Sequence, residues 1–276
     1  MSDVASILVH LDATPASVAR LEVASELAVR LDAGITALFG AAWDADRTSF
    51  AYSASAALEA STSDPAALAT ENAKAHLRAH ELFESPEVAW CEIVGHSVTR
   101  GFVEEAVYAD LRVVGQESRL PEAGSAPAGF VETVILDSGK PTLVVPTAMR
   151  TSTVARRIVV AWNGSPQAAR ALAGALPLLR LADEVHVASW SRLAPAAPFS
   201  RVDAVAWLRR HGVEARSHLL EASAHVAREL GPFAASVGGD LIVMGCYGRS
   251  RASERVFGGA TRSVLAAMDV AVLMAH

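Results

Sequence analysis

The feature of this chain that most constrains its fold is an internal repeat. Residues 7–15 read ILVHLDATP and residues 158–166 read IVVAWNGSP, so the same pattern of apolar and polar positions occurs twice. A second matching pair lies near the end of each half, with DLRVVG at 110–115 and DLIVMG at 240–245. Similar segments in the same order indicate a duplicated structural unit. The sequence therefore predicts two copies of one fold.

The length of the chain agrees with two domains. At 276 residues it is long enough for two units of roughly 100–200 residues each. Residues 146–157, PTAMRTSTVARR, have no apolar periodicity and are predicted to connect the copies. We therefore place the boundary near residue 150, which gives a first domain of residues 1–149 and a second of residues 150–276.

Each repeat begins with a buried strand that runs into a helix. The apolar run is followed by a polar residue, a small residue, a hydroxyl residue and a proline. Thr14 and Ser165 are predicted to cap their helices through the side-chain hydroxyl. Pro15 and Pro166 are predicted to occupy the first helical position, where proline is tolerated.

Strands and helices are predicted to alternate through both halves. Strands are expected near residues 6–11, 34–40, 88–94, 111–115, 142–146, 157–162, 184–190, 213–220, 240–245 and 270–275. Helices are expected over residues 65–84 and about 201–211, with Gly212 ending the second of these. Such alternation implies a mainly parallel sheet covered by helices on both faces. The predicted fold class is α/β, with two tandem, open, twisted, parallel five-stranded sheets of Rossmann-like type.

Composition argues against several classes of protein. Hydrophobic residues make up 51% of the chain and charged residues 20%, as in globular domains. No run of about 18 apolar residues predicts a membrane span, and the N-terminus has no leader-like pattern. The two cysteines, Cys91 and Cys246, fit neither a disulfide framework nor a metal-binding pattern and favour the cytoplasm. The histidines lack the spacing of metal ligands, so no metal site is predicted.

Charge is divided unequally between the halves. Residues 1–149 hold 21 acidic and 9 basic side chains, a net charge of −12, whereas residues 150–276 hold 9 and 15, a net charge of +6. An anionic ligand is therefore expected to prefer the second half. Attraction between the halves is the alternative reason for the asymmetry. Because the basic residues are scattered and have no aromatic platform, nucleic acid is not an expected partner.

The segment that carries chemical information runs from Gly245 to Leu265 and reads GCYGRSRASERVFGGATRSVL. Its glycines let the backbone approach a ligand closely or adopt a positive φ. It ends in a predicted helix, whose first amide groups are unpaired and favour an anion. Four arginines against one glutamate favour the same ligand. The segment therefore predicts a phosphate site, to which Thr261 can add a hydroxyl donor.

This segment resembles the phosphate loop of the universal stress protein family. The family carries G-x2-G-x9-G-[S/T] after its fourth strand, and Gly245, Gly248 and Gly258 have that spacing here. Position 259 is Gly where the family has Ser or Thr, while Thr261 matches a further family hydroxyl. The chain as a whole is similar to two family domains in tandem.

The resemblance implies a fold like that of the adenine-nucleotide α-hydrolases, with ATP, alone or with Mg²⁺, bound above the carboxyl ends of the strands. Carried onto this sequence, the nucleotide contacts lie in the second half. They are Ala161, Trp162, Asn163, Trp190, Met244, Gly245, Gly248, Arg249, Gly258, Gly259, Ala260 and Thr261. Asn163 replaces the family's Asp, so a ribose would meet an amide instead of an anionic acceptor.

The first half keeps the corresponding aspartate, Asp12, but not the loop. Gly115 matches the first glycine, Ser118 and Ala128 replace the second and third, and Gly129 follows. The residues between carry two prolines and two acids. Because like charges repel, the first half is predicted not to bind phosphate.

Three functions remain open from the sequence. The leading one is a stress-response protein that binds an adenine nucleotide and acts through its conformation or its partner contacts. The second is a scaffold or chaperone-like protein without a nucleotide. The third is an enzyme such as an adenylyl-transferring ATPase. No P-loop lysine, catalytic triad or metallohydrolase pattern occurs, so the chain is not expected to be an enzyme.

Two further expectations concern assembly and a loop. The last strand of each half, such as residues 270–275, is an edge suited to pairing with another sheet. The two halves are expected to pair within one chain, or two chains to form a dimer. Residues 44–63, rich in Ala and Ser, are predicted to form a mobile lid or loop.

Overall fold

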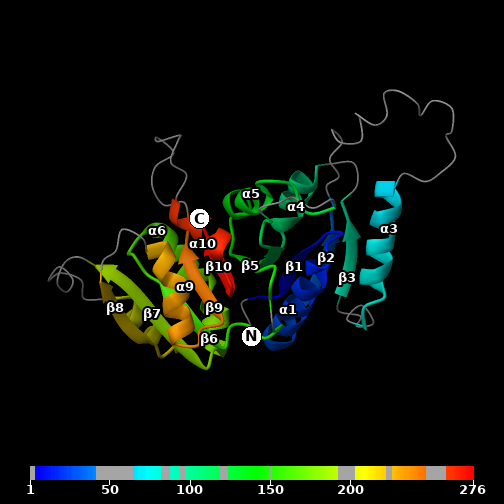
Figure 1. Cartoon of the computed structure of the whole chain (residues 1–276). Coiled ribbons are helices and arrows are strands. Elements are labelled where there is room, and N and C mark those ends of the chain that lie inside the picture. Colours follow the sequence, from blue (N-terminus) through cyan, green and yellow to red (C-terminus); the bar gives the residue numbers. More distant parts are fainter. Residues whose placement is uncertain are drawn as a thin grey trace, which may run out of the picture.

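The computed structural model shows two α/β halves side by side (Figure 1). It describes residues 4–41, 65–81, 88–93, 97–118, 124–149, 151–191, 203–221, 226–246 and 259–276. The predicted lid at residues 44–63 lies outside these residues.

Strands and helices alternate in both halves, as predicted. The first half contains β1 (Ser6–Leu11), α1 (Ala16–Leu31), β2 (Gly34–Phe39), α3 (Pro65–Arg78), β3 (Val88–Glu92), α4 (Val98–Ala106), β4 (Leu111–Gly115), α5 (Phe130–Asp137) and β5 (Thr142–Val145). The second half contains β6 (Arg157–Ala161), α6 (Pro166–Gly174), α7 (Leu176–Leu181), β7 (Glu184–Ser191), α8 (Ala204–Arg210), β8 (Arg216–Glu221), α9 (Val226–Ser236), β9 (Leu241–Gly245), α10 (Gly259–Ala267) and β10 (Ala271–Ala275).

The strands of each half are parallel and follow the same order. The first half has the order β3-β2-β1-β4-β5, and the second half repeats it as β8-β7-β6-β9-β10. The predicted fold class is therefore confirmed. In each half the direction of chain winding reverses between the first and fourth strands, which places a switch point at β1/β4 and another at β6/β9.

The two five-stranded sheets join into one ten-stranded sheet. β5 and β10 pair antiparallel, with Leu143 opposite Leu273 and Val144 opposite Val272. All four of these side chains are fully buried. Of the two assemblies expected from sequence, the structure has the pairing within one chain. Residues 146–156 connect β5 to β6, and the division into two domains near residue 150 stays a prediction.

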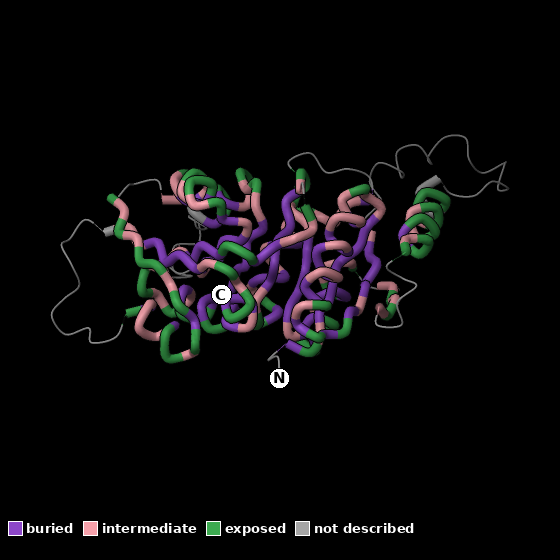
Figure 2. The backbone as a smooth tube through the Cα atoms, turned by 90° about the horizontal axis from the view of Figure 1, so that it is seen from below, coloured by how far each residue is buried: buried purple, intermediate pink, exposed green. Residues whose placement is uncertain are grey.

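Two apolar cores cover the two faces of this continuous sheet. One core contains side chains of α1, α6, α7 and α8, and the other contains side chains of α4, α5, α9 and α10. Figure 2 shows the buried backbone running through the middle of the molecule, with exposed positions on the outer sides of the helices. Because both cores extend across the β5–β10 junction, the halves share their hydrophobic interior as well as their sheet.

The start of α6 follows the sequence, whereas α1 differs from it at two positions. α1 begins at Ala16, so Pro15 is its N-cap and not its first helical residue as predicted. Ser165 caps α6 by accepting a hydrogen bond from the Ala168 N–H, at 3.1 Å, and Pro166 is the first helical residue, as predicted. Thr14 does not cap α1. Its hydroxyl donates instead to Asp12 Oδ1, at 2.6 Å, because that buried carboxylate is the stronger acceptor.

The end of α8 explains a shift in one strand boundary. Gly212 has φ of +79° and its N–H donates to Arg209 O, while the Val213 N–H donates to Leu208 O. These two bonds form a Schellman motif, in which Gly212 ends the helix as predicted. Since residue 213 belongs to this cap, β8 begins at Arg216 instead of near residue 213.

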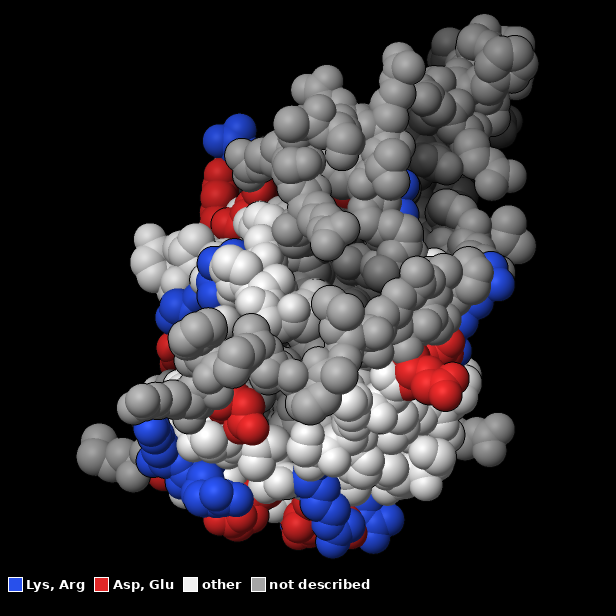
Figure 3. All heavy atoms as spheres, turned by 90° about the vertical axis from the view of Figure 1, so that its left-hand side faces the viewer, with Lys and Arg blue, Asp and Glu red and all other residues white. Residues whose placement is uncertain are grey.

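Charged side chains on the second half are mixed in sign. Figure 3 shows basic and acidic groups lying among one another on this end of the molecule. Glu184 accepts a hydrogen bond from Arg216 Nη1 at 2.8 Å and forms an ion pair with Arg157, whose Nε lies 3.2 Å from its carboxylate. Among the described residues, no helix is long and apolar enough to cross a membrane. Within the same residues, no cluster of three or more His, Cys, Asp or Glu side chains could hold a metal ion.

Candidate ligand sites at the two switch points

The two switch points place matched residues at one position in each half. In the second half β6 ends at Ala161 and β9 at Gly245, and Asn163 follows β6 by two residues. In the first half β1 ends at Leu11, β4 ends at Gly115 and Asp12 follows. The carboxyl ends of strands at a switch point are where open α/β sheets bind their ligands.

Four of the residues predicted for the nucleotide site lie together at the second switch point. Ala161 is opposite Met244 on the neighbouring strand, and Gly245 ends that strand. Asn163 is exposed, and its Oδ1 accepts a hydrogen bond from the Ser165 N–H at 3.0 Å. The amide oxygen therefore forms a turn within its own loop, a role that Asn commonly has before a helix.

Gly245 is required here by close packing. A Cβ at this position would lie 2.4 Å from the Ala168 nitrogen and 2.4 Å from the Gln167 carbonyl carbon. The first turn of α6 thus lies directly against the end of β9. Close backbone approach of helix and strand explains this glycine without a ligand.

The two tryptophans predicted to contact the nucleotide have protein partners. Trp162 is half-buried and packs against the core on the α6 side of the sheet. Trp190 Nε1 donates to Glu229 Oε2 of α9 at 2.9 Å, and its ring packs on the other face. The two rings therefore lie on opposite faces of the sheet.

The remaining predicted residues lie on the loop and on α10. Thr261 is buried in α10, and Gly259 and Ala260 begin this helix. Gly248, Arg249 and Gly258 lie outside the described residues. The set of nucleotide contacts predicted from the sequence therefore stays a prediction.

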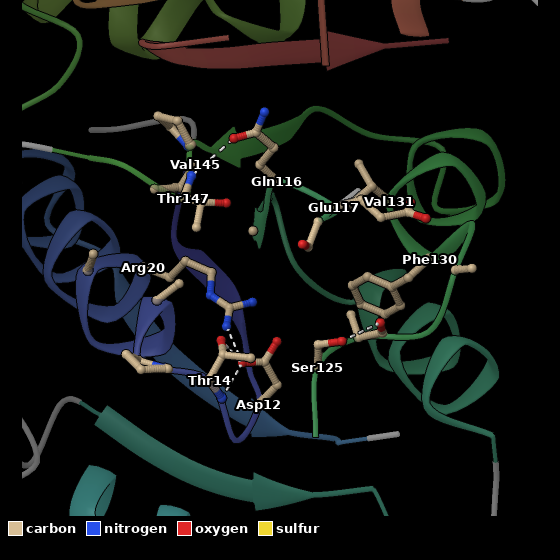
Figure 4. A pocket seen from close by; sticks show the side chains of 18 residues that line it. Asp12, Thr14, Arg20, Gln116, Glu117, Ser125, Phe130, Val131, Val145 and Thr147 are labelled. Atoms are coloured by element: carbon tan, nitrogen blue, oxygen red, sulfur yellow. Dashed lines mark hydrogen bonds and ion pairs between the residues drawn. The ribbon is translucent and has the colours of Figure 1, made fainter. Parts of the chain in front are cut away.

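The first switch point holds a cavity of about 370 Å³, which sequence reasoning did not predict. It lies between the start of α1, the end of β4 and the start of α5 (Figure 4). Its polar lining residues are Asp12, Thr14, Arg20, Gln116, Glu117, Ser118, Ser125 and Thr147. Its apolar and glycine lining is Pro15, Ala16, Ala19, Gly115, Ala126, Ala128, Phe130, Val131, Val145 and Pro146.

A buried ion pair forms one side of this cavity. Arg20 and Asp12 are only 3% and 4% exposed, and Arg20 Nη2 lies 2.6 Å from Asp12 Oδ1. Ser17 Oγ also donates to Asp12 Oδ1 and accepts from Arg20 Nη2. Burial alone would raise the pKa of Asp12, but the attraction of Arg20 outweighs it and lowers that pKa well below its usual range. The carboxylate is therefore ionised at any physiological pH.

The buried group of Asp12, Ser17 and Arg20, which we call the Arg20 cluster, extends to a buried histidine. Arg20 Nη1 donates to His10 Nδ1 at 3.2 Å, so the proton of the neutral ring is on Nε2, which donates to Gly40 O at 2.9 Å. The rings of Phe102 and Phe130 pack against this imidazole. Burial, followed by repulsion from Arg20, lowers the pKa of His10 to about 4.

This shift predicts that stability falls as the pH falls below about 6.5. The unfolded histidine takes up a proton near its ordinary pKa, whereas the folded one stays neutral until about pH 4. Protonation of the unfolded chain therefore costs roughly 2 kcal/mol of stability between pH 7.5 and pH 5, from a lowering to about pKa 4. Urea unfolding at both pH values, with wild type and His10→Gln, measures it. We expect a smaller fall in the variant, and equal falls would contradict the assignment.

The sequence contains a signal for the Arg20 cluster. Ser17, Arg20, Ala24 and Leu27 follow helical spacing on the buried face of α1. A charged residue in such an apolar row requires a buried partner, and Asp12 is the acidic residue next to the helix. In the second half the matching positions carry Ala171 and Asn163, so no ion pair forms there.

Glu117 and Gln116 connect the cavity to both halves. Glu117 Oε1 accepts from the Gly129 N–H, at 2.8 Å, immediately before α5. Gln116 Oε1 accepts from the Thr147 N–H, and its Nε2 donates to Leu265 O of α10 at 2.7 Å. Gln116 therefore connects the cavity of the first half to α10, the helix that follows the glycine-rich segment of the second half.

The strand order, the switch points and the repeat define the class of protein. It is a tandem, Rossmann-like α/β protein with one candidate ligand site per half. The universal stress protein family model matches residues 155–276. Residues 155–276 are therefore similar to a universal stress protein domain, which confirms the resemblance in the second half, and the first half repeats its strand order.

Solved structures with this fold cover nearly the whole chain. A universal stress protein from Archaeoglobus fulgidus is 17% identical, has a TM-score of 0.70 and covers 98% of this chain and 95% of its own. A protein of unknown function from Pseudomonas aeruginosa is also 17% identical, has a TM-score of 0.57 and covers 99% of this chain and 92% of its own. At these identities the likeness shows the fold. None of the curated proteins compared with the chain matches it.

Proposed function

We propose that this chain is a cytoplasmic stress-response protein that binds ATP or a related adenine nucleotide in its second half. It acts through nucleotide-dependent conformation or partner contacts, and we assign it no catalytic step. The observation that supports the proposal is the β6/β9 switch point, where Ala161, Asn163 and Gly245 lie at the carboxyl ends of neighbouring strands.

The charge distribution and α10 support the same half. The glycine-rich segment from Gly245 leads into α10, which begins at Gly259. A helix N-terminus favours a phosphate, and the second half carries a net charge of +6. We propose that Gly248, Arg249, Gly258 and the first amides of α10 hold the phosphates, alone or with Mg²⁺.

A scaffold or chaperone-like protein without a nucleotide is the second candidate. Two observations favour it. Gly245 is explained by the packing of α6, and Trp190 is bonded to Glu229. Under this reading the second switch point is a structural junction, and the protein acts through its surface.

Equilibrium dialysis with labelled ATP tests the proposal. We expect wild type to retain ATP and Gly248→Glu to bind at least tenfold more weakly, because the new carboxylate repels the phosphates. Ser118→Glu, the matched change in the first half, is the control and should bind ATP like wild type. If wild type retains no ATP, the nucleotide proposal is wrong and the scaffold is favoured.

A further inference from the structure

The cavity of the first half has the size of a small-molecule site. Its volume of about 370 Å³ is within the range of about 300–1,000 Å³ typical of ligand pockets. Asp12, Thr14 and Arg20 form one side, and Phe130, Val131 and Val145 belong to its apolar lining (Figure 4). A ligand here would meet polar groups on one side and apolar surface on another.

Four of the donor side chains that line this cavity are directed at partners within the protein. Arg20 directs Nη1 at His10 and Nη2 at Asp12, and its Nε is buried away from solvent. The Thr14 hydroxyl donates to Asp12, and the Ser125 hydroxyl to Ala126 O. The amide of Gln116 donates to Leu265 O. These four side chains therefore have little to donate to a ligand.

Acceptors, in contrast, remain open. The protein donors that reach Asp12 all use Oδ1, and within the described residues Oδ2 has no hydrogen-bond partner. Figure 4 shows this carboxylate at the edge of the cavity. A carboxylate held ionised by Arg20 is a strong acceptor for a ligand N–H or O–H.

Glu117 supplies a negative charge at the place where an anionic ligand would bind. Its carboxylate accepts the Gly129 N–H at the start of α5, so it already neutralises the positive end of that helix. A phosphate that entered the cavity would face both Glu117 and Asp12 at short range. The Glu117 carboxylate therefore takes the place that a phosphate would occupy at the start of α5.

We propose that this cavity is a second ligand site, which takes a small unphosphorylated molecule bearing hydrogen-bond donors, either hydroxyl groups or a protonated amine. The donors bind Asp12 Oδ2, and the body of the ligand lies against the apolar lining. Phosphorylated ligands are excluded by Glu117 and Asp12. The site is independent of the nucleotide site proposed for the second half.

Isothermal titration calorimetry on the full-length Gly248→Glu protein tests the site. The probes are adenosine, which carries hydroxyl donors, phenethylamine, which carries an ammonium group, and AMP. We expect adenosine or phenethylamine to bind, and which one binds identifies the source of the donors. If adenosine binds, we expect AMP to bind at least tenfold more weakly than adenosine. If phenethylamine binds instead, we expect no detectable binding of AMP.

Two variants assign the binding to the cavity. Ala19→Leu adds bulk to the cavity from α1 and leaves Asp12 and Arg20 unchanged in sequence, and we expect it to abolish binding of the probe. Val29→Leu, on an exposed position of the same helix, is its matched control and should bind the probe like the parent Gly248→Glu protein. Glu117→Gln keeps an oxygen for the Gly129 N–H but removes the charge, so binding of AMP should improve about tenfold relative to the parent protein.

Several results would overturn this site. They are the absence of binding by both adenosine and phenethylamine, binding of AMP as tight as that of adenosine, and binding that persists in Ala19→Leu. None of these results depends on ATP. A failure of wild type to retain ATP, with adenosine or amine binding intact, contradicts only the nucleotide proposal for the second half.

Discussion

The Arg20→Met variant is expected to lose about 3–5 kcal/mol of unfolding free energy, because it leaves the Asp12 carboxylate buried without its cation. Asp12 and Arg20 are almost completely buried, and their closest atoms are 2.6 Å apart. Because Met retains most of the length of the Arg side chain, the loss of unfolding free energy measures the removal of the charge more than the creation of a cavity. Urea unfolding at pH 7.5 measures it.

A double variant provides the control. Arg20→Met combined with Asp12→Asn removes both charges, and we expect it to recover most of the loss, since a pair replaced by neutral groups is often close to neutral in stability. The second half supports this expectation because it folds with Asn163 and Ala171 at the matching positions. A single variant that loses less than about 1 kcal/mol would mean that the pair contributes as little as exposed ones do.

The second large effect is expected at Gly245. Replacement by alanine places a Cβ 2.4 Å from two backbone atoms of α6, and backbone cannot turn aside as a flexible side chain does. We expect Gly245→Ala to lower the unfolding free energy by about 3 kcal/mol, at the upper end of overpacking effects, because α6 must move off the end of β9. Thermal and urea unfolding both measure this change.

Gly231 provides the matched control for Gly245. It lies within α9, and a Cβ there would have no neighbour within 4 Å. Gly231→Ala should therefore be neutral or stabilise the protein by up to about 1 kcal/mol through helix propensity. If Gly245→Ala proves as harmless as this control, the contact between α6 and β9 is looser than the structure describes.

Much of the fold was predictable because its signals are local. Strand positions follow from apolar runs, and the caps at Ser165 and Gly212 follow from the chemistry of hydroxyls and positive φ. The repeat indicates that both halves share one strand order, and the structure has that shared order. Thr14 was an exception, because its nearest strong acceptor is the side chain of Asp12, whose charge state depends on Arg20.

The candidate sites were predictable only in part. The sequence located Asn163 and Gly245 at strand ends, and the topology places them at a switch point. The expectation that the first half rejects phosphate stays a prediction, and the Glu117–Gly129 contact now supplies a physical reason for it. The cavity itself was missed, because it depends on three segments that are distant in the chain.

The duplication, the α/β class and the family resemblance follow from the amino-acid sequence alone, since each depends on periodicity or on spacing within short segments. Three features follow only from the folded chain. They are the pairing of β5 with β10, the ion pair of Arg20 with Asp12 and the hydrogen bond from Gln116 to α10. Partners that are far apart in sequence are selected by packing and by the pairing of buried polar groups, which no local pattern records.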